Sequence, residues 1–360
     1  MDLNSLIYEK IIYSRIKGLS AESKMLLIFM CRDMSSTQNY NKRLVDMVED
    51  YGFSRTQIVK SKKQLLDLGV IVPNVKTDDK RSRGRQVSSY QIEQQVLDNL
   101  LEKSSVELST LALSRIRQLT RSKSSVTPSS RMLVMMLIGV SNRLGVIDNV
   151  GAVELAHWMG CTEKRIQSMV KKLRQMEVIK HYIPGVCHRY LGKRKAVYFL
   201  DLQKLGIKRP RGTKILLPEG ESIASLVDID GEYNRNNKLK SDGRSLGGFA
   251  YYVVLEQQLT HSLLRQIDYK LEMLVLGLVN CKKISRGTCK EDCRNAIPAT
   301  FERLDITHEY QRQLLEFMVK RAIRICHFVF RQQDAITELS MDKIELSYKS
   351  PMERFLVFFD

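Results

Sequence analysis

A segment of this 360-residue chain occurs twice, at a fixed spacing of 108 residues. The stretch "YGFSRTQIVKSKKQLLDLGVI" (51–71) aligns with "MGCTEKRIQSMVKKLRQMEVI" (159–179) without a gap. Aligned positions share their chemical character: Ser54 with Thr162, Ile58 with Ile166, Leu65 with Leu173 and Val70-Ile71 with Val178-Ile179. A repeat constrains the fold strongly, because both copies must form the same structural unit.

The match extends in both directions at the same spacing. Downstream it pairs Arg81 with Arg189, Gly84 with Gly192, Arg85 with Lys193, Tyr90 with Tyr198 and Ile92 with Leu200. Upstream it pairs the apolar Met25, Leu26 and Phe29 with Leu133, Val134 and Leu137. Chance does not explain a match of this length without an insertion. The chain therefore contains two copies of one module, at about 18–92 and 126–200.

Each copy predicts three helices. The first follows "LSAES" or "TPSS", and a turn containing Gly52 or Gly160 separates a short second helix from a long third one. Ser54 and Thr162 are suited to cap the third helix, because a side-chain oxygen at that position can satisfy a free backbone amide. The sequence Ser54-Arg55-Thr56-Gln57 also matches a capping box.

The third helix carries an apolar stripe. In the second copy the stripe has helical spacing and consists of Ile166, Met169, Val170, Leu173 and Met176. In the first copy, Ser61 and Lys62 occupy two of the equivalent positions, so the pattern is weaker there. After each third helix, a short apolar run, a basic loop with a glycine and a second apolar run predict a β-hairpin.

Three helices followed by a basic hairpin resemble the winged helix-turn-helix fold. The stretch "ELAHWMGCTEKRIQSMVKKL" (154–173) carries the resemblance most specifically, with core and turn positions at Leu155, Ala156, Gly160, Thr162, Ile166 and Leu173. The first copy departs from the pattern at Val48, which aligns with Ala156 of the second copy. The resemblance implies a mainly α protein with small β-hairpins, in which two tandem winged-helix modules precede a helical C-terminal domain.

The charge of the chain indicates a polyanionic partner. Its formal net charge is +18 and its pI is about 9.6. Such an excess attracts nucleic acid first and an anionic membrane surface second. No apolar run is long enough for a membrane helix, and the N-terminus does not resemble a signal peptide. Seven cysteines without an export signal favour reduced thiols in the cytoplasm.

The exposed face of each third helix suits double-stranded DNA. An α-helix fits the major groove, where Arg can bind guanine, Gln can bind adenine and Glu can accept from cytosine, while Lys contacts phosphate. In the first copy the candidate DNA-binding residues are Ser54, Arg55, Thr56, Gln57, Lys60 and Lys63. In the second copy they are Thr162, Glu163, Lys164, Arg165, Gln167, Ser168, Lys171 and Lys172.

Both hairpin tips are also basic. The resemblance predicts wings that lie along the minor groove or the DNA backbone. The tip residues are Arg81, Arg83 and Arg85 in the first copy, and Arg189, Lys193, Arg194 and Lys195 in the second. A single basic loop would fit a solvated surface loop as well as it fits a DNA-binding wing. Two such loops at equivalent positions, each beside a basic helix, favour DNA binding. Because the exposed faces differ, we expect two different half-sites, or one specific and one mainly electrostatic contact.

The domain organisation follows from the repeat. We expect an N-terminal winged-helix module (1–92), a helical spacer (93–125), a second module (126–200), a basic flexible linker (201–249) and a helical C-terminal domain (250–360) for dimerisation or partner binding. The tail "MERFLVFFD" is either a strand or a docking peptide. The linker segment "IKRPRGTK" (207–214) resembles part of an AT-hook, although the central Arg-Gly-Arg-Pro is absent. Its candidate minor-groove or phosphate contacts are Lys208, Arg209, Arg211 and Lys214, and the alternative is a solvated basic linker.

Four cysteines are candidate zinc ligands, although we expect no cofactor. They are Cys281, Cys289 and Cys293, with Cys326 or the neighbouring His327 as the fourth. Their spacing does not match the paired C-x-x-C motifs of zinc knuckles. Thiols near helix ends are ordinary in cytosolic proteins, so structural cysteines are the alternative.

The sequence does not predict an enzyme. Phosphate-binding glycine patterns are absent, and the histidines and carboxylates form no recognisable catalytic set. We expect a cytoplasmic, sequence-specific DNA-binding protein, favoured as a transcription regulator whose C-terminal domain dimerises or contacts RNA polymerase. One alternative is a replication initiator of a plasmid, phage or mobile element that recruits the replication machinery. A second alternative is a non-catalytic scaffold that uses winged helices for protein contacts.

Overall fold

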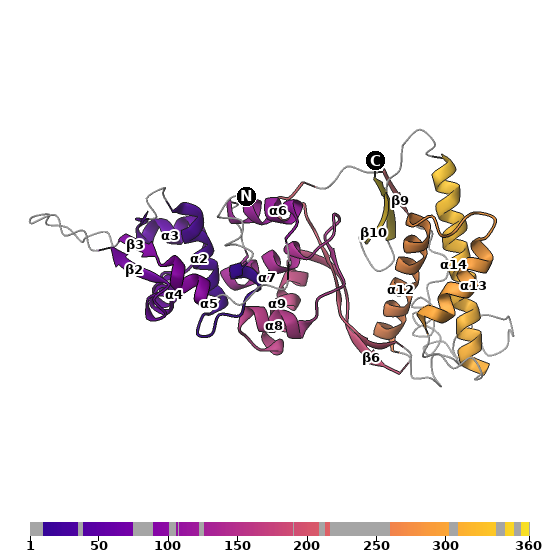
Figure 1. The fold of residues 1–360 in the computed structure, drawn as a ribbon, viewed down its shortest axis with the longest axis horizontal. Helices are drawn as coiled ribbons and strands as arrows, with labels where there is room; N and C mark the ends of the chain where they lie inside the picture. Colours follow the sequence, from indigo (N-terminus) through magenta and orange to yellow (C-terminus); the bar gives the residue numbers. More distant parts are fainter. Residues whose placement is uncertain are drawn as a thin grey trace, which may run out of the picture. The chain divides into compact units, whose positions relative to one another are not determined.

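The protein is mainly helical, with small antiparallel sheets, as expected at this level of detail. The computed structural model describes residues 10–34, 39–74, 89–100, 106, 108–121, 126–189, 191–208, 213–216, 260–301, 309–335, 343–348 and 354–359. The chain divides into two compact units (Figure 1). Unit 1 comprises Met1–Ile179 and Asp201–Lys208, and unit 2 comprises Lys180–Leu200 and Arg209–Asp360.

The secondary structure repeats at the spacing found in the sequence. The first copy contains α2 (Ala21–Asp33), β1 (Asn39–Tyr40), α3 (Leu44–Tyr51), α4 (Arg55–Asp67), β2 (Ile71–Asn74) and β3 (Ser89–Ile92). The second contains α7 (Pro128–Gly139), β4 (Val146–Ile147), α8 (Ala152–Met159), α9 (Glu163–Gln175), β5 (Ile179–Ile183) and β8 (Val197–Leu200). Adding 108 to the bounds of α3, α4 and β3 gives the bounds of α8, α9 and β8.

The turn before each third helix has the same local chemistry in both copies. Gly52 ends α3 with φ 71° and Gly160 ends α8 with φ 63°, a left-handed conformation that favours glycine. The Ser54 hydroxyl then accepts from the Gln57 amide at 3.2 Å, and the Gln57 side chain accepts from the Ser54 amide at 2.9 Å. The predicted capping box is therefore present. Thr162 caps α9 with a longer bond, 3.4 Å from the Arg165 amide.

The weak stripe of the first copy has a structural explanation. Ser61 is buried, and Lys62 is half-buried with its ammonium 4.5 Å from the centre of the Tyr90 ring. The aromatic face attracts the cation, so the alkyl stem can follow the core while the charge stays partnered. Burial lowers the pKa of Lys62. Lys62 can therefore occupy a position of the apolar stripe that is taken by Val170 in the second copy.

The two copies pack on each other within unit 1. Helix α2 lies against α7, and Lys24 of α2, which is fully buried, donates to the Trp158 carbonyl at 2.6 Å and to the Ser14 carbonyl. Trp158 lies in the last turn of α8, where carbonyls have no partner inside the helix. The Trp158 ring also contacts Tyr13 edge to face, with centroids 4.9 Å apart. A cation from one copy therefore satisfies a helix end of the other.

Gly139, the last residue of α7, allows the segment before α2 to approach closely. A Cβ atom at this position would collide with the Tyr13 hydroxyl and lie 2.8 Å from Leu108 Cδ2. The Tyr13 hydroxyl is held in place by its 2.7 Å hydrogen bond to the Met136 carbonyl. The helix itself would favour alanine over glycine by about 1 kcal/mol, so packing and helix propensity act in opposite directions here.

We expect Gly139→Ala to lower the free energy of unfolding by about 1–3 kcal/mol, because the overpacking outweighs the gain in helix propensity. Denaturant unfolding followed by the fluorescence of Trp158, the single tryptophan, measures this change. The double variant Tyr13→Phe/Gly139→Ala, compared with Tyr13→Phe alone, should show a smaller loss. A Gly139→Ala protein more stable than the parent would contradict the expected collision.

Two helices occupy the predicted spacer. They are α5 (Gln94–Leu100) and α6 (Thr110–Arg121), and α6 packs against α7. Arg115 of α6 is buried and donates to the carbonyls of Asn142 and Arg143, at 3.0 and 2.5 Å. Helix α6 of the spacer is therefore part of unit 1 and packs beside the second copy.

Among the residues that the structure describes, unit 2 contains three helices and two small sheets besides most of β5 and all of β8. The helices are α12 (His261–Asn280), α13 (Cys289–Thr300) and α14 (Glu309–Ala335), and α14 packs against both α12 and α13 (Figure 1). One sheet has the order β10-β11-β9, formed by β10 (Lys343–Tyr348), β11 (Arg354–Phe359) and β9 (Thr213–Leu216). The other is the hairpin of β6 (Val186–His188) and β7 (Gly192–Arg194).

The three-stranded sheet corrects two expectations about the C-terminal half. The region 250–360 is not wholly helical, and the expected flexible linker 201–249 contains β9. The tail forms strand β11, with Leu356 opposite both Leu346 and Ile215. Asn280 at the end of α12 exchanges two 2.9 Å hydrogen bonds with the Ile344 backbone, which ties β10 to the helices. The short apolar run of the linker became a strand because the tail, far along the chain, supplies its partner.

Candidate functional site

The third helix of the first copy, α4, exposes most of the side chains predicted to bind DNA. Ser54, Arg55, Thr56, Lys60 and Lys63 are exposed, while Ile58, Ser61 and Leu65 form the buried face. Gln57 is different, since it is only half-exposed and its amide oxygen is used in the capping box. A bidentate contact with adenine needs that oxygen, so Gln57 is better assigned to the helix start than to base recognition.

Helix α9 exposes every predicted residue of the second copy. The exposed set is Thr162, Glu163, Lys164, Arg165, Gln167, Ser168, Lys171 and Lys172. The buried face consists of Ile166, Met169, Val170 and Leu173, four of the five residues of the predicted stripe, whereas Met176, the fifth, is the C-cap of α9 and is half-buried. Arg174 is exposed as well and was missed by the sequence analysis, although it lies one helical turn after Lys171.

Arg165 links the two copies. Its guanidinium lies 2.9 Å from the carboxylate of Glu22 in the first turn of α2, and the Arg165 side chain is 53% exposed. The two residues of this ion pair are 143 positions apart in the sequence, so the repeat alone does not predict the pair. A DNA contact by Arg165 would compete with Glu22, which makes Lys164, Lys171 and Lys172 the simpler candidates for phosphate contacts.

The hairpin of the second copy is present and its tip is basic. Cys187 pairs with Lys193 and His188 with Gly192, and Arg189, Lys193, Arg194 and Lys195 are exposed. Burial, together with the nearby charge of Arg189, lowers the pKa of His188. The hairpin therefore places several cations around one turn.

Helix α12 supports the base of this hairpin. The Gln266 side-chain amide donates to the Pro184 and Lys195 carbonyls, at 2.8 and 3.1 Å, and Tyr269 packs edge to face on Phe199. Gly185 is required where the strands approach, because a Cβ atom there would lie 2.9 Å from the Arg194 carbonyl oxygen. The hairpin is thus fixed at its base, and its basic side chains remain exposed.

Several predicted site residues lie outside the described residues: Arg81, Arg83 and Arg85 of the first hairpin, and Arg209 and Arg211 of the AT-hook-like segment. The strands that flank the first tip, β2 and β3, pair antiparallel as predicted, with Asn74 opposite Ser89. Lys208 is exposed. Lys214 is also exposed but lies in β9, opposite Val357, so its backbone belongs to a sheet.

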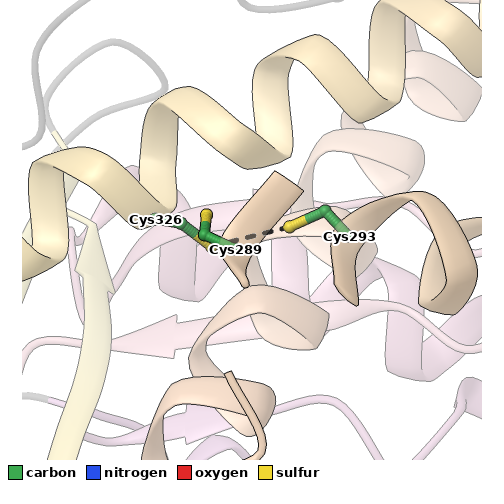
Figure 2. A group of neighbouring side chains, drawn as sticks. All are labelled: Cys289, Cys293 and Cys326. Atoms are coloured by element: carbon green, nitrogen blue, oxygen red, sulfur yellow. Dashed lines mark hydrogen bonds between the residues drawn. The ribbon is translucent and has the colours of Figure 1, made fainter. Parts of the chain in front are cut away.

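Three of the four candidate zinc-binding cysteines converge in unit 2. Cys289 and Cys293 lie one turn apart on α13 and Cys326 lies on α14, and the three side chains point toward one another (Figure 2). Their sulfur atoms all lie within 4.8 Å of one another, and Cys293 Sγ is 3.6 Å from Cys326 Sγ. All three are buried. Cys281 is exposed and does not belong to the cluster, and His327 is exposed as well.

Burial and hydrogen bonds within the cluster shift the pKa values of the three thiols. Hydrogen bonds from Cys326 and Cys289 stabilise the Cys293 thiolate and lower its pKa. Burial raises the pKa of Cys289, and the hydrogen bond to Cys293 together with burial raises the pKa of Cys326.

No protein-family model matches the sequence, and a search of curated proteins likewise finds no match. Within the described parts of the chain, no helix combines the length and the apolar character needed to cross a membrane.

Proposed function

We propose that this chain is a sequence-specific double-stranded DNA-binding protein whose two copies act as tandem winged-helix modules. The observation that carries the proposal is the pair of equivalent helices α4 and α9. Each follows a left-handed glycine, begins at a hydroxyl cap and turns a basic face to solvent. Both belong to unit 1. An apolar stripe and a basic face on one capped helix suit insertion into the major groove.

The contacts would divide by chemistry. Arg55 and Glu163, in the first turns of α4 and α9, are suited to base edges, while Lys60, Lys164 and Lys171 are suited to phosphates. The free amides at each helix start add a favourable site for phosphate. The hairpin at β6 and β7 supplies further backbone contacts. Because α4 has no carboxylate at the position of Glu163, we expect the two helices to prefer different half-sites.

The biological role that we favour is transcription regulation, with unit 2 serving dimerisation or contact with RNA polymerase. The alternative, initiation of replication of a plasmid, phage or mobile element, fits a single chain that carries two readers for an iterated origin sequence. Nuclease footprinting separates the two roles, since protection of a promoter supports the first and protection of an iterated origin supports the second. A monomeric mass by light scattering at micromolar concentration would contradict dimerisation.

The salt dependence of binding tests the proposal against a scaffold role. A protein that neutralises six to ten phosphates should lose about 10³–10⁵-fold in duplex affinity between 50 and 200 mM salt, because bound counterions are released. Fluorescence anisotropy with a duplex selected from a random pool measures this loss, and a scrambled duplex is the control for specificity. Weak binding that hardly changes with salt would refute DNA recognition and favour a scaffold that binds proteins.

A further inference from the structure

We propose that Cys289, Cys293 and Cys326 bind one zinc ion through three thiolates, with a solvent molecule as the fourth ligand. The site lies in unit 2, on α13 and α14, and its residues are separate from those proposed to contact DNA. Its test involves no DNA, so the two proposals can fail independently.

The separation of the sulfur atoms fits a shared metal. A tetrahedral zinc with Zn–S bonds of about 2.3 Å holds its sulfur ligands about 3.8 Å apart. Cys293 Sγ and Cys326 Sγ are 3.6 Å apart, and all three sulfur atoms lie within 4.8 Å of one another. A disulfide requires about 2.05 Å between sulfurs. The arrangement therefore fits three ligands around one ion more closely than it fits a disulfide.

The composition of α13 also favours a metal. The buried residues of this helix are Cys289, Cys293 and Ile297, so two of its three inward positions are thiols. Pro298 lies within the helix and weakens its last turn. A helix with so little aliphatic surface gains little from apolar burial alone. Zinc coordination would strengthen the packing of α13 on α14.

The surroundings provide for the fourth ligand. Asp292, which lies between the two cysteines of α13, has a buried carboxylate oxygen without a hydrogen-bond partner among the described residues. A zinc-bound water molecule could donate to this oxygen, as ligands of metal sites commonly do to neighbouring carboxylates. Thiolates select zinc over magnesium and calcium, and each bound thiol releases its proton to solvent.

Metal analysis and cobalt substitution test the site. The purified full-length chain, kept reduced, should contain about one zinc per chain. Cobalt added to the metal-free protein should give the intense thiolate-to-cobalt charge-transfer band and the visible bands of tetrahedral coordination. We expect Cys293→Ser to lower cobalt affinity at least about ten-fold, whereas Cys281→Ser, which removes an exposed cysteine outside the cluster, should bind like the parent. Absence of the thiolate band in the parent, equal binding by Cys293→Ser, or one copper per chain would overturn the proposal.

A second measurement does not depend on the folding of a variant. Removing zinc from the unaltered chain with a chelator should speed the alkylation of Cys289, Cys293 and Cys326, measured by mass spectrometry of peptides. Added zinc should reverse this effect. The exposed Cys187 and Cys281 are internal controls whose alkylation should not change. Equal alkylation of the three buried thiols with and without zinc would refute the site.

Discussion

Replacing Arg321 by alanine is expected to lower the free energy of unfolding of unit 2 by about 3–5 kcal/mol. Arg321 of α14 is 7% exposed and lies 3.2 Å from the carboxylates of both Asp268 and Glu272, which are one turn apart on α12. These carboxylates are themselves buried. Without the guanidinium, two like charges would face each other in the interior without the cation that lies between them.

Far-UV circular dichroism during denaturant unfolding measures the loss in Arg321→Ala. The fluorescence of Trp158, which belongs to unit 1, follows the other unit in the same experiment. Arg43→Ala is a matched control, because Arg43 pairs with Asp46 on the surface and is 70% exposed. Exposed pairs contribute little to stability. If the two variants unfold at the same denaturant concentration, the buried ion pairs do not hold α12 to α14.

Removing two cations from either proposed reading helix should weaken duplex binding by about ten- to hundred-fold at 0.1 M salt, and should reduce the salt slope by about two. The variants are Arg55→Ala/Lys60→Ala in α4 and Lys164→Ala/Lys171→Ala in α9. All four side chains are exposed, so the folded protein should be unaffected. Anisotropy titrations at several salt concentrations give both quantities.

Arg15→Ala/Lys17→Ala is the matched control for these variants. It removes the same charge from exposed positions of unit 1 that belong to neither helix. If both helix variants bind no more weakly than this control, α4 and α9 do not contact DNA. If only one of them loses affinity, one copy reads DNA and the other has a different role.

Short-range sequence features were sufficient to predict the helices of the two copies. The capping box at Ser54, the left-handed glycines and the apolar stripe of α9 each depend on residues within one or two helical turns. The repeat then provided two independent observations of the same pattern. These features predicted where α4 and α9 begin, after Ser54 and Thr162, and the observed helices start 108 residues apart as the alignment requires.

Contacts between distant residues could not be predicted in this way. The sequence around Ile215 does not predict that this residue pairs with Leu356 in a sheet. The sequence around Arg165 does not predict its ion pair with Glu22 either. The cysteines show the same limit, because the sequence offered Cys281 as a candidate ligand beside Cys289, Cys293 and Cys326, whereas among the described residues helix packing brings Cys326, and not Cys281, to the pair on α13. Periodicity shows which face of an element is apolar, but not which other element covers it.

The buried Lys24 has a consequence for the geometry of any site that both copies read. Its ammonium ties a helix of one copy to the end of a helix in the other, so a shared interior rather than a free tether sets the separation of α4 and α9. If a target has two half-sites, the major grooves of both must then face the same side of the duplex. An insertion of about five base pairs, half a helical turn, would carry one half-site to the opposite side of the duplex.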